Sequence, residues 1–162
     1  MLKKPIVYVE STVINYLFEE NQSEKRRDTW MLWDEIKAGK YAMVIADTVV
    51  LEIMNCPDDL EKKWKMIDEL NKVNYTLTTA TESEKANTLA KLYISAGGLP
   101  PKCKNDALHI AAATLANCDF IVSWNFNHIV NIRAMTAVDA VNAAERLKPV
   151  KLVSPTNFLR EE

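Results

Sequence analysis

The stretch Lys104 to Ile129, KNDALHIAAATLANCDFIVSWNFNHI, is the most informative part of the chain. Its first half, Asn105–Ala116, is rich in alanine and predicts a helix. The apolar run at Asp119–Ser123 follows and predicts a short strand that is buried on both faces. A helix that leads directly into a buried strand is typical of α/β proteins with a parallel sheet.

The same alternation of apolar runs and helical periodicity extends over the rest of the sequence. The other predicted strands are Pro5–Val9, Tyr41–Ala46, Asn74–Thr79 and Val150–Val153. The predicted helices are Glu10–Phe18, Ser23–Lys40 ending near Gly39, Val49–Asn55 stopped by Pro57, Asp58–Lys72, Thr81–Ala96 and Val138–Leu147, with one further turn at Pro155–Leu159. Because parallel neighbours require crossovers, this order predicts a parallel sheet covered by helices on both faces.

Length and composition favour one soluble globular domain that spans residues 1–162. The chain is 48% hydrophobic and 26% charged, with 3 glycines and 6 prolines, which excludes disordered and fibrous classes. The formal net charge of -2 excludes a global basic field, so any contact with nucleic acid has to be local.

Cysteine usage and the N-terminus predict a cytoplasmic protein with no membrane association. Cys56, Cys103 and Cys118 are odd in number and lack CxxC spacing, which disfavours a disulfide framework or a zinc ribbon. Near the N-terminus, Glu10 interrupts the apolar run after five residues. A signal peptide or a span of about 20 apolar residues is therefore not expected.

Candidate chemistry lies where predicted strands end. Ligands of an open parallel sheet bind beyond the carboxyl ends of its strands. Glu10 and Asn125 follow two predicted strands, Glu52 lies about a helical turn beyond another, and Asp106 opens the helix that leads to the fourth. These oxygen-bearing side chains could converge on one rim and hold a hard cation such as Mg²⁺, which suits phosphodiester hydrolysis.

Each of these four residues also has a purely structural interpretation. Glu10 in a first helical turn is explained by the helix dipole, and Glu52 by being the solvated position of an otherwise apolar helix. Asp106 is a natural helix cap, and Asn125 a natural turn former. Position alone leaves both interpretations open.

Other polar and aromatic residues point less directly to a site. His109 shares a helix face with Asp106, and without a matching His or Cys motif it is more typical of a packed histidine near the site than of a ligand. Trp30, Trp33 and Trp64 lie on helical apolar stripes, which favours core or interface positions. Four scattered basic residues could form a phosphate-binding rim: Lys40, Lys102, Lys104 and Arg133. Basic residues this far apart in the sequence are more commonly plain solvated surface.

Taken together, the pattern resembles the PIN-domain family, which includes the VapC-like toxins of type II toxin–antitoxin systems. The resemblance covers Ile6 to Leu159, and its matching pieces are IVYVESTVINYL, TVVLEIMN and the opening stretch Lys104–Ile129. It implies a three-layer α/β/α fold with a parallel sheet in the order 3-2-1-4-5. It also implies RNA cleavage with Mg²⁺ or Mn²⁺, a homodimer, and an antitoxin partner.

The resemblance assigns roles to particular residues. Glu10, Glu52 and Asp106 fall at the first three acidic positions and are the expected metal ligands, while Asn125 takes the place of the fourth acid as a further catalytic residue. The residues expected to contact substrate are Ser11, Ser123 and Lys104. The chain departs from the commoner pattern at Glu10 and Asn125, where Asp is usual; Asn keeps an oxygen but removes a charge.

Two functions of different classes are consistent with these residues. The first is a metal-dependent endoribonuclease in which Glu10, Glu52 and Asp106 hold the ion and the Asn125 amide orients water or metal. The second is a PIN-fold module that binds RNA or an antitoxin in the same pocket with little or no catalysis. A phosphotransfer enzyme is disfavoured, because no D-x-D motif follows the first predicted strand.

Overall fold

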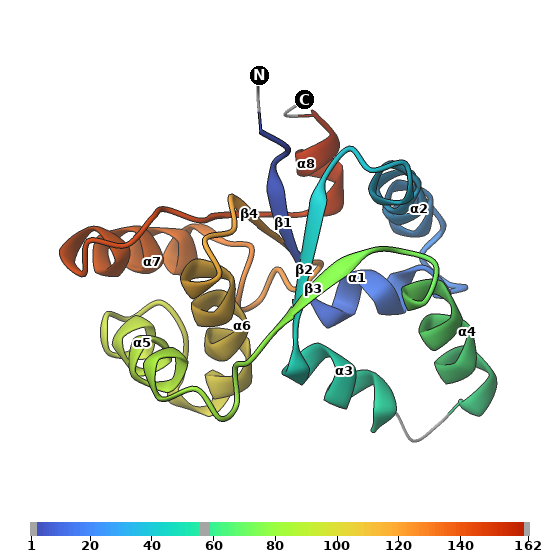
Figure 1. Ribbon diagram of the computed structural model, residues 1–162. Coiled ribbons are helices and arrows are strands. Elements are labelled where there is room, and N and C mark those ends of the chain that lie inside the picture. Colours follow the sequence, from blue (N-terminus) through green and yellow to red (C-terminus); the bar gives the residue numbers. More distant parts are fainter. Residues whose placement is uncertain (1–2, 56–58, 161–162) are drawn as a thin grey trace.

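Five parallel strands form the centre of the computed structural model, which describes residues 3–55 and 59–160 (Figure 1). They are β1 (Ile6–Val9), β2 (Ala42–Ala46), β3 (Tyr75–Thr78), β4 (Phe120–Val122) and β5 (Lys151–Val153). Their order across the sheet is β3-β2-β1-β4-β5, and every neighbouring pair is parallel. The predicted fold class and strand order are confirmed.

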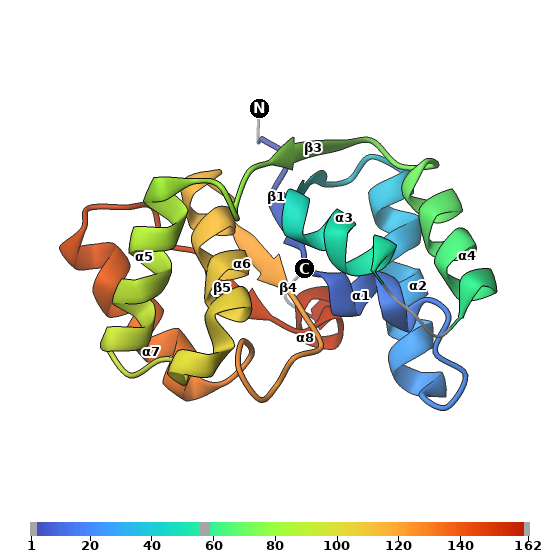
Figure 2. The same cartoon turned by 90° about the horizontal axis from the view of Figure 1, so that it is seen from below.

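The helices lie in two groups on opposite sides of the sheet, as Figures 1 and 2 show. On one side are α5 (Glu84–Ser95), α6 (Lys104–Leu115) and α7 (Ile132–Ala144). On the other are α1 (Ser11–Tyr16), α2 (Ser23–Lys37), α3 (Asp47–Met54) and α4 (Leu60–Leu70), with α8 (Pro155–Arg160) packed against α2. From β1 in the centre, β2 and β3 are added toward one edge of the sheet. The chain then crosses back, and β4 and β5 are added on the other side of β1. Because crossovers are right-handed, this reversal of direction places the later helices on the opposite face.

The burial of the strands in the core explains why their sequences are continuous apolar runs. Val7, Tyr8 and Val9 of β1 are fully buried, since β1 is the central strand and is covered on both faces. Every residue of α6 from Ala107 to Thr114 is buried. Its alanines allow α6 to lie close to both α5 and the sheet, and α5 and α6 form the most extensive helix pair.

The main error in the predicted elements concerns α7, which begins at Ile132 and ends at Ala144 instead of spanning Val138–Leu147. The helix is capped by Asn131, whose side chain accepts a hydrogen bond from Ala134 N over 2.8 Å. Ile132 in the first turn is 81% exposed, so the amphipathic pattern begins only later along the helix. Cys56, the predicted helix stop at Pro57 and the predicted helix start at Asp58 lie outside the described residues.

A buried charged group links α2 to α4. Trp33 is fully buried, and its Nε1 donates to Glu69 Oε1 over 3.0 Å. Lys37 and Lys72 reach the same carboxylate at 3.1 and 2.9 Å. Trp33 is therefore a core residue, as the sequence predicts, while Trp64 on α4 is exposed.

Cys103 and Cys118 are free thiols. Across residues 3–55 and 59–160, none of the helices is both long enough and apolar enough to cross a membrane.

Candidate active site

The register of the sheet brings together two residues that follow different strands. Val9 of β1 pairs with Val122 of β4, so Glu10 and Ser123 leave the sheet at the same level. The backbone N–H of Glu10 donates to Val122 O, which holds the two strand ends together. The strand order reverses between β1 and β4, and this crevice is the place where open parallel sheets bind ligands.

Glu10 is only 2% exposed, and its carboxylate accepts four hydrogen bonds. Oε1 accepts from the hydroxyls of Thr12 and Ser123 at 2.6 and 2.5 Å. Oε2 accepts from the Ser11 hydroxyl at 2.8 Å and from Thr12 N at 3.1 Å. The last bond makes Glu10 the N-cap of α1, so the residue is both a helix cap and the inner wall of the candidate site.

Glu52 reaches the same place from α3 and is held from two sides. Its Oε1 lies 2.8 Å from His109 Nε2 on α6, and its Oε2 accepts a hydrogen bond from the Ser11 hydroxyl. The Ser11 hydroxyl thus contacts both Glu10 and Glu52, although it has one proton for two carboxylate oxygens. Carboxylates from two different units of the chain therefore meet at a single hydroxyl group.

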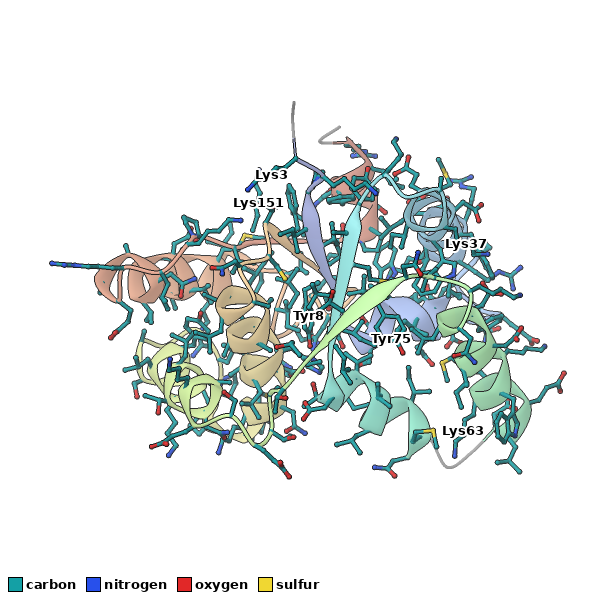
Figure 3. The ribbon with its side chains drawn as sticks, viewed as in Figure 1. Lys3, Tyr8, Lys37, Lys63, Tyr75 and Lys151 are labelled. Atoms are coloured by element: carbon teal, nitrogen blue, oxygen red, sulfur yellow. The ribbon has the colours of Figure 1, made fainter. Side chains whose placement is uncertain are left out.

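His109 connects this pair of acids to the core. Its ring is 1% exposed, and Nδ1 lies 2.6 Å from the Tyr8 hydroxyl of β1. Figure 3 shows Tyr8 near the centre of the molecule. Because Glu52 is an acceptor, Nε2 carries the proton toward it, and Nδ1 of a neutral ring accepts from Tyr8. A buried chain of hydrogen bonds thus runs from β1 through α6 to the site.

The electrostatics of this hydrogen-bonded chain of side chains favour an ionised Glu52. Burial raises the pKa of Glu52, but the hydrogen bond and charge of His109 and the hydrogen bond from Ser11 outweigh burial and lower it. Burial lowers the pKa of His109, yet the hydrogen bond to Glu52 and the nearby acids raise it overall. Desolvation raises the pKa of Tyr8 well above its ordinary value, so its hydroxyl stays protonated.

Asp106 lies in a neighbouring group on the first turn of α6. Its Oδ2 is 3.2 Å from Nδ1 of His128 in the loop after β4. Burial and the negative charge of Glu10 raise the pKa of Asp106, despite opposing contributions that include a hydrogen bond from Asn125. The charge of Glu10 therefore acts on Asp106. The carboxylate of Asp106 nevertheless lies in a group of possible metal ligands with Cys103 and His128, and not in the group that contains Glu10 and Glu52.

The structure thus brings most of the predicted site residues to one end of the sheet, in two adjoining groups. Ser11 and Ser123 contact the acids directly. Asn125 Oδ1 accepts from His128 N at 3.0 Å and Asn125 N donates to Ser123 at 2.9 Å, which is the turn-forming role that its residue type also predicts. Lys104 is exposed at the start of α6.

Sequence reasoning missed three participants. Thr12 caps and orients Glu10, and its position two residues after a strand-end acid is the available signal. In the sequence, Tyr8 looks like any residue of a buried strand and His128 like any residue of a loop, so neither position signals a role in the site. The prediction that His109 is a packed histidine near the site is confirmed, although the sequence did not indicate its direct bond to Glu52.

Two shallow hollows flank Glu52. One of about 200 Å³ is lined by residues that include Ser11, Thr12 and Met66, and one of about 370 Å³ by residues that include Thr48 and Asn105. A larger hollow of about 680 Å³ lies along the edge strand β5, among residues such as Lys151 and Asn157, and holds none of the predicted catalytic residues. Glu52 is therefore reached from the side of α1, α3 and α6, whereas neither hollow is lined by Glu10 or Asp106.

The residues present fit a divalent metal ion at the paired acids. The donor atoms of Glu10 and Glu52 are carboxylate oxygens, the ligands that Mg²⁺ and Mn²⁺ prefer. Burial is the main cause of the raised pKa of Asp106, and the charge of Glu10 adds to it, so a cation between the acids would offset part of the shift. His109 is a poorer ligand, because both of its ring nitrogens are already hydrogen-bonded and the ring is buried.

Comparison with known proteins identifies a structural likeness. No protein-family model and no curated protein sequence matches the chain. Among solved structures, the chain is similar to a chain of VapBC2 from Rickettsia felis, crystallised bound to a DNA fragment from their promoter. The TM-score is 0.56 at 14% sequence identity, and the match covers 92% of this chain and 98% of the other. At this identity the likeness shows a shared fold.

Proposed function

We propose that this protein is a metal-dependent endoribonuclease of the PIN type. The observation that carries the proposal is the meeting of the Glu10 and Glu52 carboxylates at the Ser11 hydroxyl, at the reversal point of the sheet and beside Asp106. The three acids come from separate segments of the chain, the end of β1, α3 and α6, and lie at the same end of the sheet. A nuclease that uses a hard cation needs acids arranged in this way.

The metal would be held by Glu10 and Glu52, with Asp106 facing it from α6. A bound Mg²⁺ or Mn²⁺ supplies an acidified water and positive charge for the scissile phosphate. Ser11 keeps the two carboxylates in register through its hydroxyl. His109 holds Glu52 in place and, by lowering its pKa, keeps it ionised. Asn125, whose oxygen is already used by His128 N, acts by hydrogen-bonding Asp106.

A nucleic-acid substrate is supported by a cluster of aromatic rings beside the site. Tyr16 and Trp124 are stacked with centroids 5.7 Å apart, and Phe126 packs on Trp124 and is 45% exposed. The ammonium of Lys25 lies 5.4 to 5.7 Å from all three ring centroids. Of the three rings only Phe126 is exposed, while Trp124 is buried and Tyr16 is partly buried. An exposed ring beside a cation suits single-stranded nucleic acid, because a base can stack on the ring while the cation faces phosphate.

A protein partner is supported by exposed apolar side chains on two helices that contact each other. Leu51 and Met54 on α3 and Leu60 and Trp64 on α4 are all about half exposed or more. Exposed apolar side chains on two adjoining helices are candidates for an interaction surface. We propose that this surface serves a homodimer or an antitoxin of a toxin–antitoxin pair, in keeping with the likeness to a chain of VapBC2. Molar-mass measurement by light scattering tests the dimer directly.

The decisive experiment measures cleavage of a labelled single-stranded RNA with Mn²⁺, with Mg²⁺ and with EDTA. We expect cleavage only with metal, and a loss in Glu52→Gln larger than the roughly 10–100-fold cost of removing an outer-shell partner. Glu145→Gln is the matched control, because Glu145 is exposed at the end of α7 and the substitution removes the same charge. Equal activity in both variants would contradict the proposed role of Glu52.

A second function, binding without catalysis, is favoured by one observation. The Glu10 carboxylate already accepts hydrogen bonds from Thr12 N and from the hydroxyls of Thr12 and Ser123, and it shares the Ser11 proton with Glu52, so a metal has to compete with these bonds. RNA that binds but stays intact under every metal condition would support this function over the nuclease.

A further inference from the structure

A second group of metal-ligating side chains lies next to the paired acids and is chemically different from them. It consists of Cys103 at the end of the 3-10 turn Pro101–Cys103, Asp106 on α6, and His128 in the loop after β4. One donor atom from each residue lies within 4.8 Å of the other two. The group therefore offers a sulfur, an oxygen and an imidazole nitrogen to one point in space.

We propose that Cys103, Asp106 and His128 bind a single borderline transition-metal ion such as Zn²⁺. Thiolate, imidazole and carboxylate are the three ligand types of protein zinc sites, whereas Mg²⁺ rejects sulfur. Across a tetrahedral zinc ion, bond lengths of about 2.0–2.1 Å place nitrogen and oxygen ligands about 3.3 Å apart. Asp106 Oδ2 and His128 Nδ1 are already 3.2 Å apart, close to the separation that a shared zinc ion requires.

Backbone hydrogen bonds hold the segments that carry two of these ligands. Asn125 holds the loop that carries His128, because its Oδ1 accepts from the backbone N–H of His128 at 3.0 Å, and it also lowers the pKa of Asp106. The position of Cys103 is set by its N–H bond to Pro100 O at 2.9 Å. Hydrogen-bonded partners of this kind fix ligand geometry and strengthen metal affinity.

Solvent access distinguishes this group from His109. The side chains of Asp106 and His128 are 24% and 30% exposed, so an ion can enter and keep water as a fourth ligand. His109, by contrast, is enclosed and bonded at both nitrogens.

A consequence for activity follows, and it rests on the proposed nuclease function. Asp106 would serve both groups, so an ion held with Cys103 and His128 removes its charge from the site built on Glu10 and Glu52. Zn²⁺ should therefore inhibit Mg²⁺-dependent RNA cleavage by occupying a separate position, without replacing Mg²⁺.

The binding site is tested with Co²⁺ added to the purified full chain after reduction of its thiols. We expect a near-ultraviolet band from thiolate-to-cobalt charge transfer that saturates at one ion per chain. Cys103→Ser should abolish the band, and His128→Gln should weaken cobalt binding at least tenfold, with circular dichroism showing that both variants are folded. Asn125→Ala should weaken binding about 10–100-fold.

The matched controls are the other two cysteines. Cys118→Ala removes a buried thiol that lies just before β4 and should leave the band intact, as should Cys56→Ala. A band that survives Cys103→Ser, or no band in the folded wild type, would overturn the proposed site.

The consequence for activity is tested separately, so that the two proposals fail independently. The ratio of RNA cleavage with and without Zn²⁺ is compared between wild type and Cys103→Ser at fixed Mg²⁺. A site confirmed by cobalt in a protein that cleaves no RNA would refute the nuclease and leave the metal site standing. Equal inhibition in both proteins would refute the regulatory role alone.

Discussion

Replacing Glu10 by glutamine should destabilise the protein more than the same substitution at Glu52. The Glu10 carboxylate accepts from four donors, and one of its oxygens becomes an NH₂ group in the variant. The best arrangement keeps the oxygen toward Thr12 N and Ser11 and turns the NH₂ toward the hydroxyls of Thr12 and Ser123. Those hydroxyls also accept Trp124 N and Asn125 N, so at least one buried hydroxyl proton loses its acceptor.

The expected magnitude follows from these contacts. An unsatisfied buried polar group costs about 1–3 kcal/mol. The lost negative charge at the start of α1 costs about 0.3–1 kcal/mol more. Together they predict that Glu10→Gln lowers the free energy of unfolding by about 2 kcal/mol, which corresponds to a fall in Tm of roughly 4–8 °C for a chain of this size.

Glu52→Gln is the matched comparison. Its amide oxygen can still accept from His109, and its NH₂ can donate to Ser11, whose proton then serves Glu10 alone. No buried group is left unpaired, so the variant should lose only the favourable interaction of the Glu52 charge with His109, and its loss in the free energy of unfolding should be smaller than that of Glu10→Gln. Both variants are measured by urea unfolding at pH 7 in EDTA, with tryptophan fluorescence as the signal. A Glu10→Gln protein at least as stable as wild type would refute the role of Glu10 as a satisfied cap.

Three further predictions concern the fold and the metal. Burial raises the pKa of Glu69, but hydrogen bonds from two lysines and Trp33 lower it overall, so its stabilising effect exists above the ordinary pKa of 4.5 and disappears as pH falls through the lowered value. Urea titrations should accordingly show a gap between wild type and Glu69→Gln at pH 7 that closes in acid; a constant gap would contradict this. Gly98→Ala should lower the free energy of unfolding by about 1–3 kcal/mol, because the new Cβ would lie 2.7 Å from the Ala137 Cβ. An unchanged Tm would show that the structure relieves this contact without cost. EDTA should abolish RNA cleavage but leave circular dichroism unchanged, since the core forms without metal; unfolding on chelation would make the ion structural.

How far the site could be predicted depends on the range of the interactions that form it. Glu10 was predictable as a strand-end acid, because the burial of β1 makes Ile6–Val9 apolar and the first polar residue marks the end of the strand. The bond between Glu10 and Ser123 was not predictable, because it needs the register that pairs Val9 with Val122. Likewise, nothing local indicates that His109 Nε2 meets Glu52, 57 residues away.

The amino-acid sequence by itself determined the layered α/β architecture and the set of polar residues at strand ends, because burial and backbone hydrogen bonding act on neighbouring residues and leave a periodic pattern. Only the tertiary structure decided the grouping of those residues. It joined Glu52 to Ser11 and His109, and it placed Asp106 beside Cys103 and His128. Such contacts depend on how whole helices pack against the sheet, where a shift of a few ångströms changes a hydrogen-bond partner and leaves the sequence pattern untouched.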